Sequence, residues 1–172
     1  MLKKYSLLIV FILIVFFLLF TVSFQKEPKV FVKNKTEKNT ENLFFKKQII
    51  KYPVTGGVVN TTLGEENKTI IPVGIAADSS EINFGRTAVT TVVKKVLSLK
   101  NRESVPVKFH LRAYGNISRF MNFEKDFVLN ANETKNIEVK FNATQTGNYT
   151  GEFDITVLVP KHAILTVLLP LV

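Results

Sequence analysis

The chain of 172 residues carries few of the side chains that catalysis or metal binding requires. It has two histidines, His110 and His162, no cysteine and three aspartates. Thiol catalysis and thiolate ligation both need cysteine, so neither chemistry is available. His110 lies between Lys108 and Arg112 on the polar positions of an alternating segment, where positive charge disfavours a metal ion. We therefore expect neither histidine to be catalytic or to ligate a metal.

Two further segments contain residue types found in cation-binding or phosphate-binding sites but lack the spacing or context that such sites require. Asp78 and Glu81 flank two serines, but the segment lacks EF-hand spacing and is typical of a solvated turn. Gly56 and Gly57 do not lie between a strand and a helix, as a phosphate-binding loop requires. No Ser–His–Asp arrangement or carboxylate pair stands out. The sequence thus predicts a protein that is not an enzyme, with no cofactor and no small-molecule substrate.

The chain does carry one recurrent modification signal, the Asn-x-Ser/Thr sequon. Seven of the 14 asparagines head one, and with 23 Ser and Thr in the chain about two are expected by chance. Sequons mark surface loops of exported chains, which indicates that this part of the protein lies outside the cytoplasm. The alternative is that an Asn- and Thr-rich composition produces sequons freely. The candidate glycosylation sites are Asn34, Asn60, Asn67, Asn116, Asn132, Asn142 and Asn148.

The N-terminus has the length of a membrane anchor. Residues 5–24 are uncharged, and 17 of these 20 residues are apolar. A helix of that length spans about 30 Å, the thickness of a bilayer's hydrocarbon core. A cleaved signal peptide is the alternative, although its apolar run is usually shorter. We assign residues 1–24 to a single transmembrane helix.

The net charge of +9 does not indicate nucleic-acid binding. Residues 1–51 hold 10 lysines and 3 acids, whereas residues 52–172 hold 13 basic and 11 acidic residues. A nucleic-acid domain needs its basic excess on the folded part, because contacts with phosphates supply its affinity. Lysines lie on both sides of the anchor, so the positive-inside rule does not settle its orientation. The sequons favour a single-pass protein with its C-terminal domain outside.

The remainder predicts an all-β domain on a polar stem. Residues 25–53 are rich in Lys, Asn and Glu and show no sustained period, which is typical of a solvated stem. Residues 54–172 alternate between apolar and polar side chains in short segments separated by turns, which predicts a sandwich of about seven to nine antiparallel strands. The clearest alternation spans 107–114, 137–142 and 149–159, and weaker strands are expected over 69–76, 81–84, 90–99 and 127–129.

The sequence also makes predictions about the C-terminal segment and the core of this sandwich. Residues 163–172 are uncharged, and we expect a last core strand there, paired with residues 151–159. Phe109, Phe141 and Phe153 are expected to fill the core in place of a disulfide and a tryptophan. Tyr149 follows a glycine turn, where it is either a tyrosine corner or an ordinary core residue.

Several short motifs resemble the Ig-like domains of the ASPM/SPD-2/Hydin (ASH) and major-sperm-protein-like group. The tetrapeptide Ile82-Asn83-Phe84-Gly85, followed by a strand ending in Asn101, is similar to the opening of those domains. Residues 127–141 are similar to a later part, with Asn132 where the family usually has glycine. Residues 147–153 are similar to the Gly-x-Tyr-x-Gly entry of the penultimate strand. The resemblance covers residues 80–172 and implies an Ig-like fold, not a reaction.

Two function classes follow from these expectations. The first is a membrane-anchored glycoprotein that presents an Ig-like domain for structural or protein–protein interaction, with another envelope or surface-layer protein as its partner. The second is an accessory subunit or assembly chaperone of a surface appendage or secretion complex, acting by edge-strand pairing. The last segment discriminates between them, since a buried core strand favours the first and an exposed strand the second.

Overall fold

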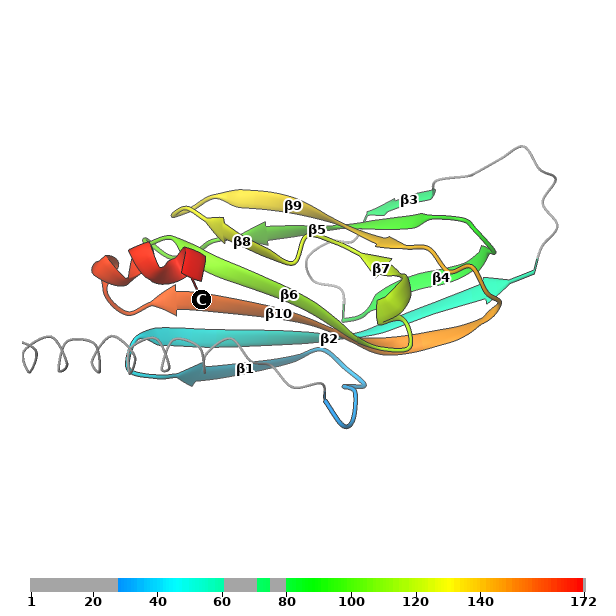
Figure 1. Cartoon of the computed structure of the whole chain (residues 1–172), viewed down its shortest axis with the longest axis horizontal. Helices are drawn as coiled ribbons and strands as arrows, with labels where there is room; N and C mark the ends of the chain where they lie inside the picture. The colour runs from blue at the N-terminus through cyan, green and yellow to red at the C-terminus, as the bar shows by residue number, and fades with distance from the viewer. Residues whose placement is uncertain (1–27, 61–70, 75–79, 172) are drawn as a thin grey trace, which may run out of the picture.

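The computed structural model describes residues 28–60, 71–74 and 80–171 (Figure 1). The predicted anchor over residues 1–24 lies outside this part of the chain, as do Asn67 and Asp78. Within the described ranges, no helix has the length and apolar character needed to cross a membrane.

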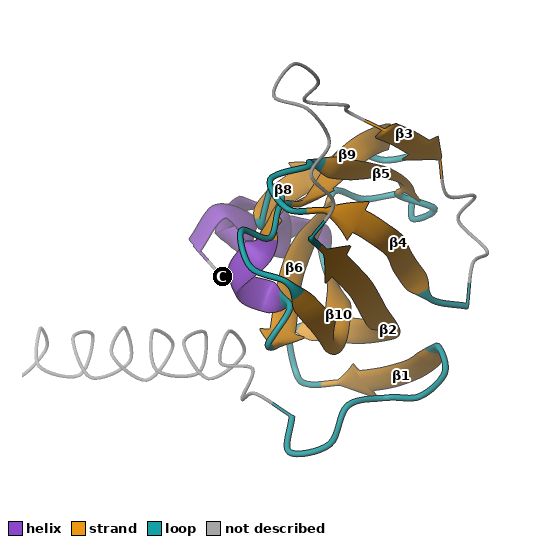
Figure 2. Ribbon diagram, turned by 90° about the vertical axis from the view of Figure 1, so that its right-hand side faces the viewer, coloured by secondary structure: helices purple, strands orange, loops and turns teal. Residues whose placement is uncertain are grey.

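The described residues form ten strands in two sheets, with two short 3₁₀ helices (Figures 1 and 2). Sheet A has the order β1-β2-β10-β6-β8, with β4 beside the second half of β2, and sheet B has the order β3-β5-β9-β7. The all-β class is confirmed, and the strand number exceeds the seven to nine predicted. The elements are β1 (Thr36–Glu41), β2 (Phe45–Val59), β3 (Ile71–Gly74), β4 (Ile82–Ala88), β5 (Val93–Lys100), β6 (Val107–Gly115), η1 (Ser118–Phe120), β7 (Met121–Asn122), β8 (Asp126–Leu129), β9 (Thr134–Phe141), β10 (Gly147–Pro160) and η2 (Ala163–Leu171).

Strand β2 corrects the predicted stem over residues 25–53. It runs without interruption across residue 54 and pairs antiparallel with β10 along almost its whole length, from Phe45 to Val58. Its outer edge is shared, because β1 pairs with residues 46–51 and β4 pairs in parallel with residues 54–59. The sequence did not predict this strand because Lys46 and Gln48 occupy core-facing positions that apolar residues usually fill. Much of the expected stem is therefore sheet.

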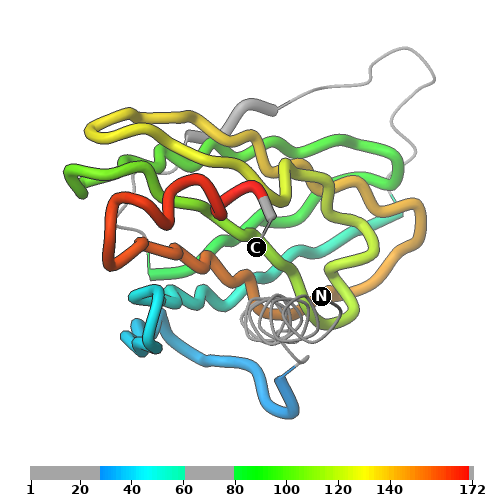
Figure 3. Tube along the Cα trace, turned by 60° about the vertical axis from the view of Figure 1, so that its left-hand side comes forward, coloured from blue at the N-terminus to red at the C-terminus, as the bar shows by residue number. Residues whose placement is uncertain are grey.

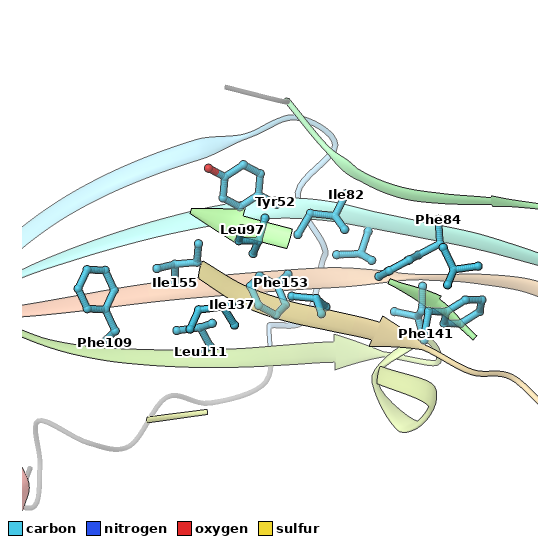
Figure 4. Close-up of a cluster of buried hydrophobic side chains, with 14 of the residues drawn as sticks. Tyr52, Ile82, Phe84, Leu97, Phe109, Leu111, Ile137, Phe141, Phe153 and Ile155 are labelled. Carbon is cyan, nitrogen blue, oxygen red and sulfur yellow. The ribbon is translucent and has the colours of Figure 1, made fainter. Parts of the chain in front are cut away.

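The core lies between the two sheets and is rich in phenylalanine (Figure 4). Phe109, Phe141 and Phe153 are all buried, as predicted. Phe141 stacks on Phe84 with ring centroids 5.1 Å apart, which joins β9 of sheet B to β4 of sheet A. Gly56 lies within β2, where a Cβ would come within 3.0 Å of the Phe141 ring. Dense ring packing supplies the stability that no disulfide provides here.

Tyr149 makes the hydrogen bond that a tyrosine corner requires. Its ring is buried near the start of β10, and its hydroxyl donates to the Gln145 carbonyl oxygen at 2.7 Å. This bond ties the strand to the connection that precedes it. Of the two alternatives left open by the sequence, the structure supports the corner.

The C-terminal segment is the second correction. Residues 163–171 form the 3₁₀ helix η2 instead of the expected strand, and they do not pair with β10. The physical reason is that β2 and β6 already flank β10 on both sides, so no backbone edge is open to the tail. Instead, η2 folds back onto the sheet (Figure 3), where Leu169 packs against Leu158 and Phe45.

Candidate functional site

The most unusual chemistry lies on the outer face of sheet A, the face turned away from the core. On β10, Phe153 and Ile155 point into the core, so Glu152 and Asp154 point outward. Both acids are nevertheless buried, at 0% and 1% exposure. Lys51 on β2 reaches them, with its Nζ 2.5 Å from Glu152 Oε1 and 3.5 Å from Asp154 Oδ2. We call these three residues the ionic cluster.

The ionic cluster also holds the segment that precedes β1. The backbone N–H of Val32 donates to Glu152 Oε2 at 2.9 Å, so the carboxylate bridges two elements 120 residues apart. Nearby, the ring of Phe31 approaches Gly115 so closely that a Cβ there would lie 3.0 Å from it. Residues 31 and 32 are therefore fixed to the outer face of sheet A.

Burial shifts the ionisation of the cluster. Removal from water, together with a hydrogen bond and charge repulsion from Glu152, raises the pKa of Asp154 to about 7, despite the nearby Lys51. Burial acts to lower the pKa of Lys51, but hydrogen bonding and attraction from both acids outweigh it and raise that pKa. Asp154 therefore exchanges its proton near neutral pH.

A second polar group occupies the same face, on β6 and β8. His110 Nδ1 lies 2.5 Å from Asp126 Oδ1, and Arg112 Nη1 donates to the same oxygen at 3.2 Å. Burial lowers the pKa of His110 in spite of this carboxylate. Although burial opposes it, the hydrogen bond with His110 and the charge of the Arg112 guanidinium lower the pKa of Asp126. His162, in contrast, lies exposed in the turn between β10 and η2.

Two surface grooves among the described residues are lined by none of these groups. Within the described ranges, no cluster of three or more His, Asp or Glu residues has the geometry of a metal site. A surface groove of about 470 Å³ lies over β1 and β2, and its lining includes Lys46, Gln48 and Glu103 but none of the ionic cluster. The ionic cluster therefore joins β2, β10 and the segment around Val32.

The six described sequon asparagines are all exposed. Four lie at the end of the molecule where β2 and β9 finish and β10 starts, on the right in Figure 1; these are Asn60, Asn116, Asn142 and Asn148. Asn116 accepts a hydrogen bond from the Thr150 N–H through Oδ1, which leaves its amide nitrogen available for a glycan. Asn132 lies in the β8–β9 turn at the other end, with a φ of 61° that asparagine tolerates. Asn34 lies between Val32 and β1.

The ionic cluster was missed by the sequence analysis for an identifiable reason. Glu152 and Asp154 fill the polar positions of an alternating strand, which predicts a solvated face. Lys51 fell within the expected stem. Two acids at positions i and i+2 of the most regular strand were the available signal, but their burial depends on elements distant in sequence.

Comparison of the chain with protein-family models, curated proteins and solved structures finds no match.

We expect the ionic cluster to make stability depend on pH. Asp154 releases its proton near pH 4 when unfolded and near pH 7 when folded. Between these values the folded state binds more protons, so the free energy of unfolding falls as pH rises. The Asp154→Asn variant should flatten this fall and exceed the wild type in stability above pH 7.

Denaturant unfolding at a series of pH values measures this effect. Glu103→Gln, at an exposed acid, is the matched control and should retain the wild-type slope. A wild-type stability that rises steadily from pH 4 to pH 7, unchanged in Asp154→Asn, contradicts the assignment.

Proposed function

We propose that this chain is a membrane-anchored extracytoplasmic glycoprotein whose Ig-like sandwich serves structural or protein–protein interaction in the cell envelope. The observation that carries the proposal is the exposure of every described sequon asparagine, four of them gathered at one end. A glycosylated end remains solvated, which leaves the other surfaces of the domain for contact. The resemblance to the ASH and major-sperm-protein-like group supports the Ig-like type of the sandwich.

Interaction through surfaces is favoured over edge-strand pairing. The C-terminal segment forms no ladder, so it is not the donor strand that the second function requires. In the described part of the chain, β1 pairs with β2 alone. Its sequence includes Glu37, Lys38 and Glu41, and charged side chains are a common protection of edge strands against pairing. We therefore propose a partner among envelope or surface-layer proteins that binds a face or loops of the domain.

Protease treatment of intact cells or spheroplasts tests the location. We expect the domain to be digested while a cytoplasmic control protein survives, because residues 25–172 face outward. Alkaline carbonate should leave the undigested chain in the membrane fraction, with its N-terminus near Met1. A domain that is protected until the cells are permeabilised contradicts the proposal, and a soluble chain beginning near Phe24 contradicts the anchor.

A further inference from the structure

The most exposed apolar side chains of the described residues form a distinct group. Val30, Ile164, Leu43 and Val167 have between 76% and 82% of their surface exposed, whereas the next in rank reaches 39%. Single exposed apolar residues are common on soluble proteins and need no explanation. Four exposed apolar residues on one side of a molecule do need an explanation.

These four residues lie on or beside the outer face of sheet A. Ile164 and Val167 belong to η2, which is held on that face by Leu169 against Leu158. Leu43 precedes Phe44, which packs on the same small cluster and whose carbonyl accepts a hydrogen bond from the Lys161 N–H. This gathers three of the four around η2.

The fourth, Val30, connects this face to the preceding chain. It lies two residues before Val32, which is bonded to Glu152 on the outer face. Eight residue steps separate Phe24, the end of the uncharged run, from Val32, and an extended chain covers about 27 Å in that length. An anchor ending at Phe24 therefore keeps Val32, and the part of the outer face around Glu152, within that distance of the bilayer.

The composition of η2 suits a lipid interface. Its sequence, AILTVLLPL, has no charged residue, and its inner side is occupied by Leu169 while Ile164 and Val167 project outward. Lys161 and His162 directly precede it, and Lys46 is exposed on β2. Basic side chains flanking an apolar surface are typical of segments that lie in the headgroup region.

We propose that η2, through Ile164 and Val167 and assisted by Leu43, inserts into the surface of the same bilayer that residues 5–24 cross. The domain then lies with the outer face of sheet A toward the membrane and with sheet B toward the exterior. This inference rests on the proposed function, since it needs the anchor, and it adds a second membrane contact that fixes the orientation of the domain.

Spin labelling of the full chain in vesicles tests the inference, because the absence of cysteine allows a single label at a chosen site. The probes are Val167→Cys and Ile164→Cys on η2. Val96→Cys, exposed on the outer face of sheet B, is the matched control, and Leu13→Cys reports on the anchor. Collision rates with oxygen and with a water-soluble nickel chelate are measured in vesicles of phosphatidylcholine and phosphatidylglycerol.

We expect the oxygen-to-nickel accessibility ratio to be several times higher at Val167 and Ile164 than at Val96. Equal ratios at the three sites, with Leu13 in lipid, overturn the inference and leave the anchor intact. A water-accessible Leu13 contradicts the anchor itself. If Val167 is aqueous in pure lipid vesicles but shielded in native membranes, a protein covers η2 and the lipid contact is wrong.

Discussion

The Gly151→Ala variant is expected to lose at least about 3 kcal/mol of the free energy of unfolding, at the upper end of the overpacking range. Gly151 of β10 lies directly opposite Gly115 of β6, where the two backbones approach closely. An ideal Cβ on Gly151 would collide with the Tyr114 carbonyl oxygen and lie 2.8 Å from Ile117 Cγ2. Because the first obstacle is backbone, the central strand pair must separate to admit a methyl group.

Gly85→Ala provides the matched comparison. Gly85 has a φ of 70°, but nothing lies within 4 Å of its ideal Cβ. The methyl group there costs only the unfavourable left-handed conformation, about 1–2 kcal/mol. Thermal and denaturant unfolding of both variants measure the difference. Equal losses would mean that β6 and β10 do not approach as described.

The Lys51→Met variant is expected to lose about 3 kcal/mol at neutral pH, near the lower end of the cost of breaking a buried ion pair. The lysine is the cation bonded to two carboxylates that are almost inaccessible to water. Its removal leaves the Glu152 carboxyl, which is inaccessible to water, without its cationic partner, and of its two hydrogen bonds described above only the one from the Val32 N–H remains. The loss should shrink at lower pH, where Asp154 is protonated.

Two further variants test whether the loss of stability in Lys51→Met comes from the buried ion pair and not from replacing any lysine. Lys140→Met removes an ion pair with Glu138 in which both side chains are at least 41% exposed, so it should cost far less stability than Lys51→Met. Glu152→Gln combined with Lys51→Met should recover part of the stability, because the buried charge is gone. If the double variant is no more stable than Lys51→Met alone, the unpaired Glu152 carboxyl is not the reason for the loss.

The strands with regular alternation could be predicted from the sequence. In β6, β9 and β10 one face meets the core, so apolar residues recur at every second position, and Phe109, Phe141 and Phe153 were identified correctly. The first half of β2 could not, since Lys46 and Gln48 occupy inward positions while Phe45 and Ile49 occupy outward ones. Its strand character is set by pairing with β10, more than 90 residues later.

The C-terminal segment and the ionic cluster show a second limit. An uncharged run such as residues 163–171 is compatible with a strand or a helix, and only the occupied edges of β10 decide between them. Likewise, Glu152 and Asp154 have the pattern of a wet face, and their burial results from neighbouring elements on that face. Local pattern predicts which face of a strand is apolar, but not what covers the other face.

We propose that the sandwich lies outside the cytoplasm. Thiol labelling of single-cysteine variants in intact cells, with a membrane-impermeant maleimide, tests this location most directly because the natural chain has no cysteine. Val96→Cys in β5 should react without permeabilisation, whereas Leu2→Cys, on the other side of the predicted anchor, should react only after it. Labelling of Val96→Cys only after permeabilisation would place the domain inside and contradict the proposed function.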